Sequence, residues 1–385
     1  MKPTVLPENP RFSSGPCVKR PGWDLNGLES EFLGRSHRSA PAKARIREVL
    51  RLMRALLRLP EDYRLAITPA SDTGAFEMAL WSLLGKCGVD VLVRDSFGAG
   101  WATEVVEELA LADVNVIEAG YGRIADFAQV KFDRDVIFTW NGTTSGVCVP
   151  DGVWIQESRA GLTFCDATSA AFAMALPWQK LDVTTYSWQK ALGGEAQHGV
   201  IILSPRAYSR LETWEPKWPI PKIFRMTKNN EPVEGFFDVD TINTPSMLCI
   251  EDILDSLLGA EAIGGAEELI RRNRENFSII EDWVAITPWI EFLATSPAIR
   301  STTSVCLSIV DPWFLSLSSS EKQKFVSGMC NLLEKEGVAF DIKGYRDAPP
   351  GIRIWAGSTV EKENIVALLP WLEWAFKRGK DVADQ

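Results

Sequence analysis

A lysine and an aspartate in the middle of the chain have the residue types and positions from which amine chemistry could be built. Lys190 follows the strand-like run TTYSWQ and precedes Gly193 and Gly194, which is an unusual place for a solvated charge. Asp166 follows the preceding apolar run, LTFC. A lysine amine can attack a carbonyl group when it is deprotonated, and a carboxylate stabilises a cation that forms beside it. A salt bridge between two loop residues is the alternative that spacing alone leaves open.

A site for pyridoxal phosphate is the more specific hypothesis for this pair. In such a site a lysine condenses with the cofactor aldehyde, and a carboxylate keeps the ring nitrogen protonated so that the ring accepts electrons. The phosphate needs backbone N–H groups at a helix start, and Ser71-Asp72-Thr73-Gly74 stands where a strand-like run becomes helix-like. Taken alone, this segment is better explained as an ordinary N-cap. Trp101, after Gly98-Ala99-Gly100, which we expect to be flexible, could stack on the ring or be one more buried tryptophan.

The elements that must position these residues alternate between short apolar runs and helix-like segments. The runs include RLAITP, VDVLVRD, DVIFTW and LDVTTYSW. This pattern predicts a mainly parallel sheet with helices on both faces, in a large α/β domain over 15–255. Reactive or small polar residues follow several runs, so we expect them at one edge of the sheet, where such folds bind ligands.

The rest of the chain, 256–385, has a different pattern. It begins with a long helical stretch and continues with the strand-like runs TSVCLSIV and IRIWAG between helix-like segments. These features predict a smaller C-terminal α+β domain. The proline-rich segment 217–235 predicts a long irregular connection, of a length that is often functional.

Composition excludes several classes of function. The net charge of −10 and the lack of a dense basic stretch argue against nucleic-acid binding. No apolar run approaches the roughly 20 residues that span a bilayer, and the N-terminal segment lacks the apolar core of a secretory signal. Seven scattered cysteines predict reduced thiols in the cytoplasm, and with only two histidines we expect no metal site.

Several short motifs together resemble the phosphoserine aminotransferase family. They are FSSGPC (12–17), SHRS (36–39), NGTTSG (141–146), SWQKALGG (187–194), NTPS (243–246) and GIR (351–353). They extend over almost the whole chain, and SWQK before two glycines, with SHRS upstream, is the specific part. The resemblance implies a class V aminotransferase with the aspartate-aminotransferase-like fold (fold type I) and pyridoxal 5'-phosphate as cofactor.

The resemblance also implies a role for each matching residue. Lys190 would form the Schiff base and Asp166 would pair with the ring nitrogen, as the catalytic residues. The other cofactor contacts would be Asp72 and Thr73 (backbone, phosphate), Trp101 (stacking), Thr143 (phenolic oxygen side), Gln189 (phosphate), and Asn243 and Thr244 from the neighbouring subunit. The last two imply a homodimer with shared active sites.

On the substrate side, the resemblance implies His37, Arg38, Arg346 and Arg353, the last as the clamp for an α-carboxylate. Anionic substrates call for guanidinium groups, which bind carboxylates through two parallel hydrogen bonds. Two features depart from the family pattern: Tyr345-Arg346 stands where many relatives have His-Arg, and SDTG replaces a more glycine-rich phosphate loop. They indicate a divergent branch. His198, after the lysine loop, is expected to bond locally rather than to act in catalysis.

The reaction that the resemblance implies moves an amino group between glutamate and 3-phosphohydroxypyruvate, giving phosphoserine and 2-oxoglutarate in serine biosynthesis. It also allows 4-phosphohydroxythreonine, of pyridoxine biosynthesis, as a substrate. A related aminotransferase acting on glyoxylate or pyruvate is one alternative, and it would not need His37, Arg38 and Arg346. A pyridoxal-phosphate-binding protein without catalysis is another. A cysteine desulfurase is disfavoured, since no cysteine lies on an evident catalytic loop.

Overall fold

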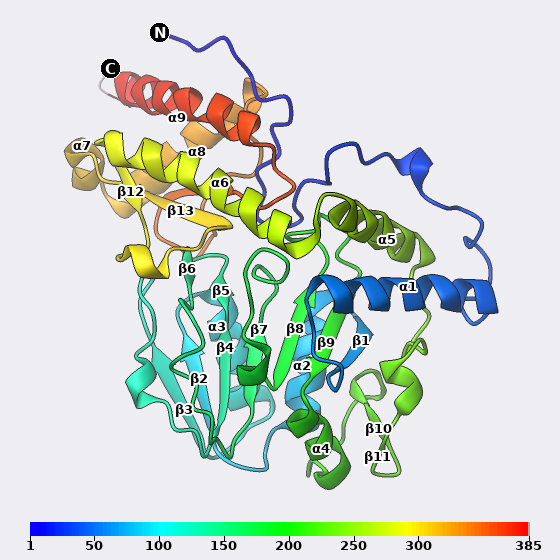
Figure 1. The fold of residues 1–385 in the computed structure, drawn as a ribbon. Helices are drawn as coiled ribbons and strands as arrows, with labels where there is room; N and C mark the ends of the chain where they lie inside the picture. The colour runs from blue at the N-terminus through cyan, green and yellow to red at the C-terminus, as the bar shows by residue number, and fades with distance from the viewer. Residues whose placement is uncertain (384–385) are drawn as a thin grey trace.

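Two β-sheets of different size organise the chain, and the computed structural model describes residues 1–383 (Figure 1). The larger sheet has seven strands in the order β1-β9-β8-β7-β4-β2-β3. Only β9 runs against its neighbours, β1 and β8, and the other pairs are parallel. The strands are β1 (Arg64–Pro69), β2 (Val89–Val93), β3 (Val114–Glu118), β4 (Asp135–Thr139), β7 (Thr163–Asp166), β8 (Val183–Ser187) and β9 (His198–Leu203). The predicted mainly parallel sheet is therefore confirmed.

Helices cover both faces of this sheet, which explains why its central strands are buried throughout. One face packs against α1 (Ala40–Leu56) and α5 (Met247–Ala262), which lie side by side in Figure 1. The other face packs against α2 (Ser71–Leu83), α3 (Ser96–Thr103) and α4 (Pro205–Thr213). The sheet therefore lies between two hydrophobic cores.

The smaller sheet is antiparallel, with three strands: β12 (Ile290–Phe292), β13 (Ser304–Ile309) and β14 (Gly351–Trp355). It packs with α6 (Gly265–Ile286), α7 (Pro312–Ser316), α8 (Ser319–Lys335) and α9 (Lys362–Ala383) around a third core. The helical stretch expected from about 255 is divided into α5 and α6, because Gly264 and Gly265 both have positive φ and interrupt the helix.

The N-terminal segment packs in this third core rather than against the large sheet. Phe12 and Val18 are buried there. The backbone N–H of Trp355 donates to the Phe12 carbonyl at 3.1 Å, and that of Phe340 donates to the Pro10 carbonyl at 2.8 Å. The start of the chain is thus fixed by its last strand and by the residues before it. The domain boundary near residue 255 stays a prediction.

Two hairpins complete the described elements. β5 (Asn141–Gly142) pairs with β6 (Val147–Cys148), inside the NGTTSG motif and just after it. β10 (Thr227–Lys228) pairs with β11 (Glu231–Pro232) inside the connection that was expected to be irregular, which otherwise contains only short 3₁₀ turns. Within residues 1–383, no helix is both long enough and apolar enough to cross a bilayer.

Candidate active site

The carboxyl ends of the parallel strands form one edge of the large sheet, and the loops after them enclose a cavity of about 210 Å³. The cavity brings together the residues predicted at successive strand ends: Asp72, Thr73, Trp101, Thr143, Asp166, Gln189 and Lys190. A larger cavity of about 570 Å³ lies near the N-terminal segment. Of its basic residues, Lys19 and Arg20 are already paired with Asp252 and Asp255, and none of the predicted site residues lines it. The smaller cavity is therefore the candidate site.

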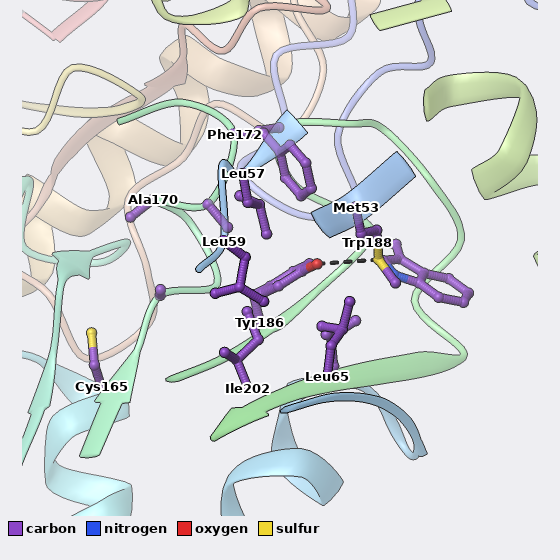
Figure 2. Close-up of a cluster of buried hydrophobic side chains, with 14 of the residues drawn as sticks. Met53, Leu57, Leu59, Leu65, Cys165, Ala170, Phe172, Tyr186, Trp188 and Ile202 are labelled. Carbon is purple, nitrogen blue, oxygen red and sulfur yellow. Dashed lines mark hydrogen bonds between the residues drawn. The ribbon is translucent and has the colours of Figure 1, made fainter. Parts of the chain in front are cut away.

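The turn that carries Lys190 follows β8, and large buried side chains fix both the strand and the turn. Tyr186 and Trp188 point to the α1 face of the sheet, where the Tyr186 hydroxyl donates to Met53 Sδ at 3.1 Å (Figure 2). Beyond Trp188 the chain turns, and Gly194 N–H donates to the Trp188 carbonyl at 2.9 Å. The two glycines that follow the lysine in the sequence therefore close a turn that holds it at the end of β8.

The Lys190 side chain is only 7% exposed, and its amine donates to the backbone carbonyl of Ser14. Gly15 lies directly against it, with φ of +144°, and a Cβ atom there would lie 2.5 Å from Lys190 Nζ. Burial lowers the pKa of the Lys190 amine, and the nearby charge of Arg353 acts in the same direction. A lowered pKa increases the share of neutral amine, which is the form that attacks carbonyls and accepts protons.

Asp166, at the end of β7, is oriented by two N–H donors. Its Oδ2 accepts from Trp101 Nε1 at 3.1 Å, and its Oδ1 accepts from the Thr168 backbone at 3.0 Å. The Trp101 indole packs against Phe76 of α2, with ring centroids 4.5 Å apart. Burial lowers the pKa of Arg94, and the charges of Asp95 and Asp166 oppose this shift.

The stretch before Trp101 is helical, although its glycines suggested a flexible loop. Asp95 caps α3 by accepting from the backbone N–H groups of Phe97 and Gly98 at 3.1 and 3.0 Å. Gly98 packs closely on β2, because a Cβ there would lie 3.3 Å from the Leu92 carbonyl oxygen. The glycine permits close packing of α3 on the sheet, and that packing fixes Trp101.

The other end of the cavity is formed by the start of α2. The N-cap residue, Ala70, has a left-handed conformation and offers no side-chain cap. The first N–H groups of a helix have no intrahelical acceptor, and the helix dipole makes that end positive. Asp72 and Thr73 lie in this first turn and line the cavity. The start of α2 is therefore suited to an anion.

Arg353 is the predicted substrate-side residue that reaches the cavity wall. It lies on β14, and its Nη1 donates to the Thr143 carbonyl at 3.5 Å. Its guanidinium is 5.7 Å from the Tyr345 ring, which is 5.9 Å from the ring of the cavity residue Phe97. Arg346 also lies over Tyr345, but its side chain is 81% exposed and paired with Asp347 at 3.4 Å.

The remaining predicted residues do not line the cavity of their own chain: His37, Arg38, Asn243 and Thr244. They lie on two segments that contact each other away from this cavity. One segment, 37–45, ends inside α1, and the other, 238–244, precedes α5. Lys43 Nζ is 2.6 Å from Asp240 Oδ1, and this ion pair joins the two segments. Burial lowers the pKa of His37, helped by the charges of Arg38 and Lys43 and opposed by that of Asp240. We call these two segments the α1–α5 patch; the roles of its residues stay predictions.

Sequence reasoning missed the hydrogen-bond network around Ser169. Thr143 Oγ1 donates to Ser169 Oγ at 2.9 Å, and Asn141 Nδ2 donates to both Ser169 Oγ and Thr303 Oγ1 at 2.9 Å. Asn141 was part of a motif without an assigned role. Ser169, three residues after Asp166, has no local signal of its own, because its importance comes from contacts across the two sheets.

Two expectations about reactive groups outside the main site can be compared with the structure. His198 is buried on β9, and burial lowers its pKa to about 4. Its Nε2 accepts from the backbone N–H of Ser246 at 3.3 Å, 48 positions away in the sequence, and not from the local partner that was expected. All seven cysteines are free. Cys17, close to Lys190, has its pKa raised to about 12 by burial, so it remains a thiol and a poor nucleophile.

Comparison with proteins of known function identifies the family. The chain is 54% identical over 380 residues to a phosphoserine aminotransferase of Methanosarcina barkeri, covering 99% of this chain and 100% of that protein. It is 53% identical over 376 residues to the phosphoserine aminotransferase of Methanosarcina mazei, covering 98% and 99%. The chain belongs to the phosphoserine aminotransferase family. The fold type, the aminotransferase class and the pyridoxal phosphate cofactor expected from the motifs are those of this family.

A solved phosphoserine aminotransferase from Cytophaga hutchinsonii shares the fold, with a TM-score of 0.79, 22% identity, and coverage of 95% of this chain and 98% of that one. No protein-family model matches the chain. The fold is therefore of type I, as predicted.

The cavity of this member of the phosphoserine aminotransferase family fits pyridoxal phosphate. It offers a buried amine, a carboxylate with fixed orientation and an uncapped helix start. Thr168 Oγ1 and Gln189 Oε1 are buried there without hydrogen-bond partners. Buried polar atoms without partners are rare in folded proteins and call for an explanation. A bound group with polar atoms of its own supplies one.

Proposed function

We propose that this enzyme transfers an amino group from glutamate to 3-phosphohydroxypyruvate, giving phosphoserine and 2-oxoglutarate in serine biosynthesis. The observation that carries the proposal is the 54% sequence identity to a phosphoserine aminotransferase over the full length of that protein. It is supported by a buried lysine and an oriented aspartate in one cavity. 4-Phosphohydroxythreonine, in pyridoxine biosynthesis, is a second proposed substrate.

Pyridoxal phosphate, when bound, supplies an aldehyde and an electron-accepting ring. Lys190 would hold its aldehyde carbon and Asp166 its ring nitrogen. Trp101 would cover its ring, and Thr143 would contact the side of its phenolic oxygen. The first turn of α2, with Asp72 and Thr73, and Gln189 would hold its phosphate.

The residues of this chain then have distinct tasks during turnover. After the amino group of the substrate has taken its place, the Lys190 amine, whose pKa burial lowers, would accept the proton from the α-carbon of the substrate and would later give that proton up. Arg353 binds the α-carboxylate with its planar guanidinium and so fixes the α-carbon beside the amine. Asp166 holds a negative charge at the far side of the site. The closely packed Ser14–Gly15 segment excludes water from one side of the amine.

We further propose a cytoplasmic homodimer in which the α1–α5 patch of one subunit completes the cavity of the other. His37, Arg38, Asn243 and Thr244 would thereby reach the substrate and the cofactor phosphate. Support comes from their position on one patch outside their own cavity, and from the exposed apolar side chains Leu248, Leu258 and Ile263 on and next to α5. We also propose that the chain is divided into two domains, 15–255 and 256–385.

A panel of amino acceptors tests the reaction. With glutamate as donor, we expect kcat/KM for 3-phosphohydroxypyruvate to exceed that for glyoxylate or pyruvate by roughly 10²-fold or more, because groups that bind a phosphate stay unpaired with the smaller acids. The Lys190→Ala variant should show no turnover. Comparable or higher kcat/KM for glyoxylate or pyruvate would overturn the assignment, and a wild-type enzyme that binds cofactor without turnover would indicate a non-catalytic protein.

Mixing two inactive variants tests the shared site. Lys190→Ala keeps the α1–α5 patch, and Arg38→Ala keeps the lysine. If sites are shared, subunit exchange creates dimers with one intact site, and activity returns in the mixture. Activity that stays at the level of the separate variants after exchange would contradict sharing.

A further inference from the structure

Asp72 has a buried carboxyl group that the proposed reaction does not use. Its assigned role involves only its backbone, yet its side chain is 6% exposed and does not serve as the N-cap of α2, which is Ala70. Asp72 lines the same cavity of about 210 Å³ as Asp166 and Thr168, and the charge of Asp166 acts on its carboxyl group. Its Oδ1 is buried without a hydrogen-bond partner.

The register of the sheet explains why Asp72 and Asp166 meet. Asp166 and Thr185 are paired positions on β7 and β8. Phe164, two residues before Asp166, packs with Phe76 of α2, and side chains two positions apart in a strand share a face. Asp166 therefore lies on the face that α2 covers. Because α2 packs across β8 and β9, its first turn brings Asp72 over this pair.

Two carboxylates in a site shielded from water cannot both be ionised without a large electrostatic penalty. Both oxygens of Asp166 already accept N–H hydrogen bonds, from Trp101 and the Thr168 backbone, so Asp166 acts as the acceptor of the pair. Asp72 Oδ1, by contrast, accepts no hydrogen bond. The proton that the pair must keep therefore belongs on Asp72.

The surroundings of Asp72 support this distribution. Burial, and then the charge of Asp166, raise the pKa of the Asp72 carboxyl well above its usual range. The positive groups near the pair are Lys190, which senses both carboxylates, and Arg94, which senses Asp166. Burial also raises the pKa of the neighbouring Cys165, so this thiol adds no charge.

We propose that Asp72 is a positioning residue for Asp166: its carboxyl is protonated at neutral pH and donates a hydrogen bond to the Asp166 carboxylate. The neutral acid stabilises the ionised partner without adding a second negative charge. It also restricts the rotation of Asp166, which is thereby held toward the ring nitrogen. The inference rests on the proposed cofactor site and explains why a residue with a carboxyl group is compatible with the SDTG loop.

Two substitutions separate a neutral donor from an ionised carboxylate. Asp72→Asn keeps the shape and an N–H donor but cannot ionise, whereas Asp72→Ala removes the donor. Asp133→Asn, at an exposed position, is the matched control. The holoenzymes are compared by the infrared band of protonated carboxyl groups at pH 7, by the pH dependence of the visible cofactor absorbance, and by kcat.

We expect Asp72→Asn to lose one protonated-carboxyl band that the wild type and Asp133→Asn retain, and to lose less kcat than Asp72→Ala, because the asparagine still offers an N–H donor to Asp166. Asp72→Ala should lower kcat at least about tenfold, as expected for one charge-assisted hydrogen bond, and should move the spectral titration. If Asp72→Ala does not fold, the infrared comparison of wild type with Asp72→Asn tests the inference by itself.

An unchanged infrared band in Asp72→Asn, or an Asp72→Asn enzyme as impaired as Asp72→Ala, would overturn the inference while leaving the proposed function intact. An Asp72→Ala enzyme with wild-type kcat and titration would do the same. A wild type that shows no visible cofactor absorbance would instead overturn the proposed function, and the inference with it.

Discussion

Replacing Gly15 by alanine should separate the activity of this enzyme from its stability. The methyl group would lie 2.5 Å from Lys190 Nζ and 3.0 Å from its Cε. Ordinary contacts between such atoms begin near 3.4 Å, so the amine must move by about 1 Å. A displacement of this size at a reacting group reduces the rate roughly 10²-fold. We therefore expect kcat to fall about 100-fold.

The effect on stability should leave the protein folded. Gly15 has φ of +144°, and an alanine in such a conformation costs about 1–3 kcal/mol of unfolding free energy. The clash itself is with the end of a flexible side chain, which can move without disturbing the backbone. The expected variant is a folded protein whose lysine amine has lost its contact with the Ser14 carbonyl.

The assay combines steady-state kcat, visible cofactor absorbance and thermal unfolding. Gly27→Ala is the matched control, because a Cβ at Gly27 meets no atom within 4 Å. We expect Gly27→Ala to keep wild-type activity and absorbance. A Gly15→Ala enzyme with kcat within about threefold of wild type would refute the reasoning, since the lysine would then tolerate displacement. A Gly27→Ala enzyme with an equal loss of kcat would show that the effect is not specific to the lysine contact.

Three further outcomes follow from the same structure. His198 has a folded-state pKa of about 4 instead of 6.5, so below pH 6.5 the unfolded chain binds a proton that the folded state does not, and the free energy of unfolding falls by about 3 kcal/mol between pH 6.5 and 4. Urea unfolding of the His198→Gln variant should lack this loss. The same pH dependence in wild type and variant would contradict the prediction. Arg353→Lys should raise KM for glutamate about 10-fold or more with a smaller change in kcat, because lysine cannot form paired hydrogen bonds to a carboxylate; an unchanged KM in steady-state assays would exclude Arg353 as the clamp. Trp188→Ala should lower the unfolding free energy by about 3–5 kcal/mol, because removal of the buried indole leaves a cavity. A loss of less than about 1 kcal/mol in a denaturant titration would show that this side chain does not stabilise the segment before Lys190.

The large sheet and the residues at its edge could be predicted from the sequence, because the same pattern recurs at each strand. The strands of the large sheet are buried on both faces and therefore appear as apolar runs, and the residues after them share one edge because most of these strands are parallel. This pattern therefore predicts Lys190, Asp166 and Trp101 in one site from the sequence alone. The family resemblance added roles that geometry alone does not assign.

The contacts that complete the site could not be predicted in this way, because they join residues distant in the sequence. The Ser14 carbonyl on Lys190, the Asp72 carboxyl over Asp166 and the network at Ser169 depend on register and helix placement. Two local predictions were also incomplete. The glycines before Trp101 allow tight packing of a helix instead of a loop, and one long helical stretch is divided at Gly264.

The packing of the first residues in the C-terminal core has a consequence for how the protein is made. The segment that places Ser14 and Gly15 over Lys190 is held from two sides: Cys17 donates to the Gln189 carbonyl, while Phe12 and Pro10 accept from Trp355 and Phe340. On the ribosome, the last two of these bonds can form only after nearly the whole chain has emerged. We expect nascent chains that end before residue 340 to leave this amine open to amine-reactive reagents, whereas completed chains protect it. Enclosure of the amine would then mark the end of synthesis.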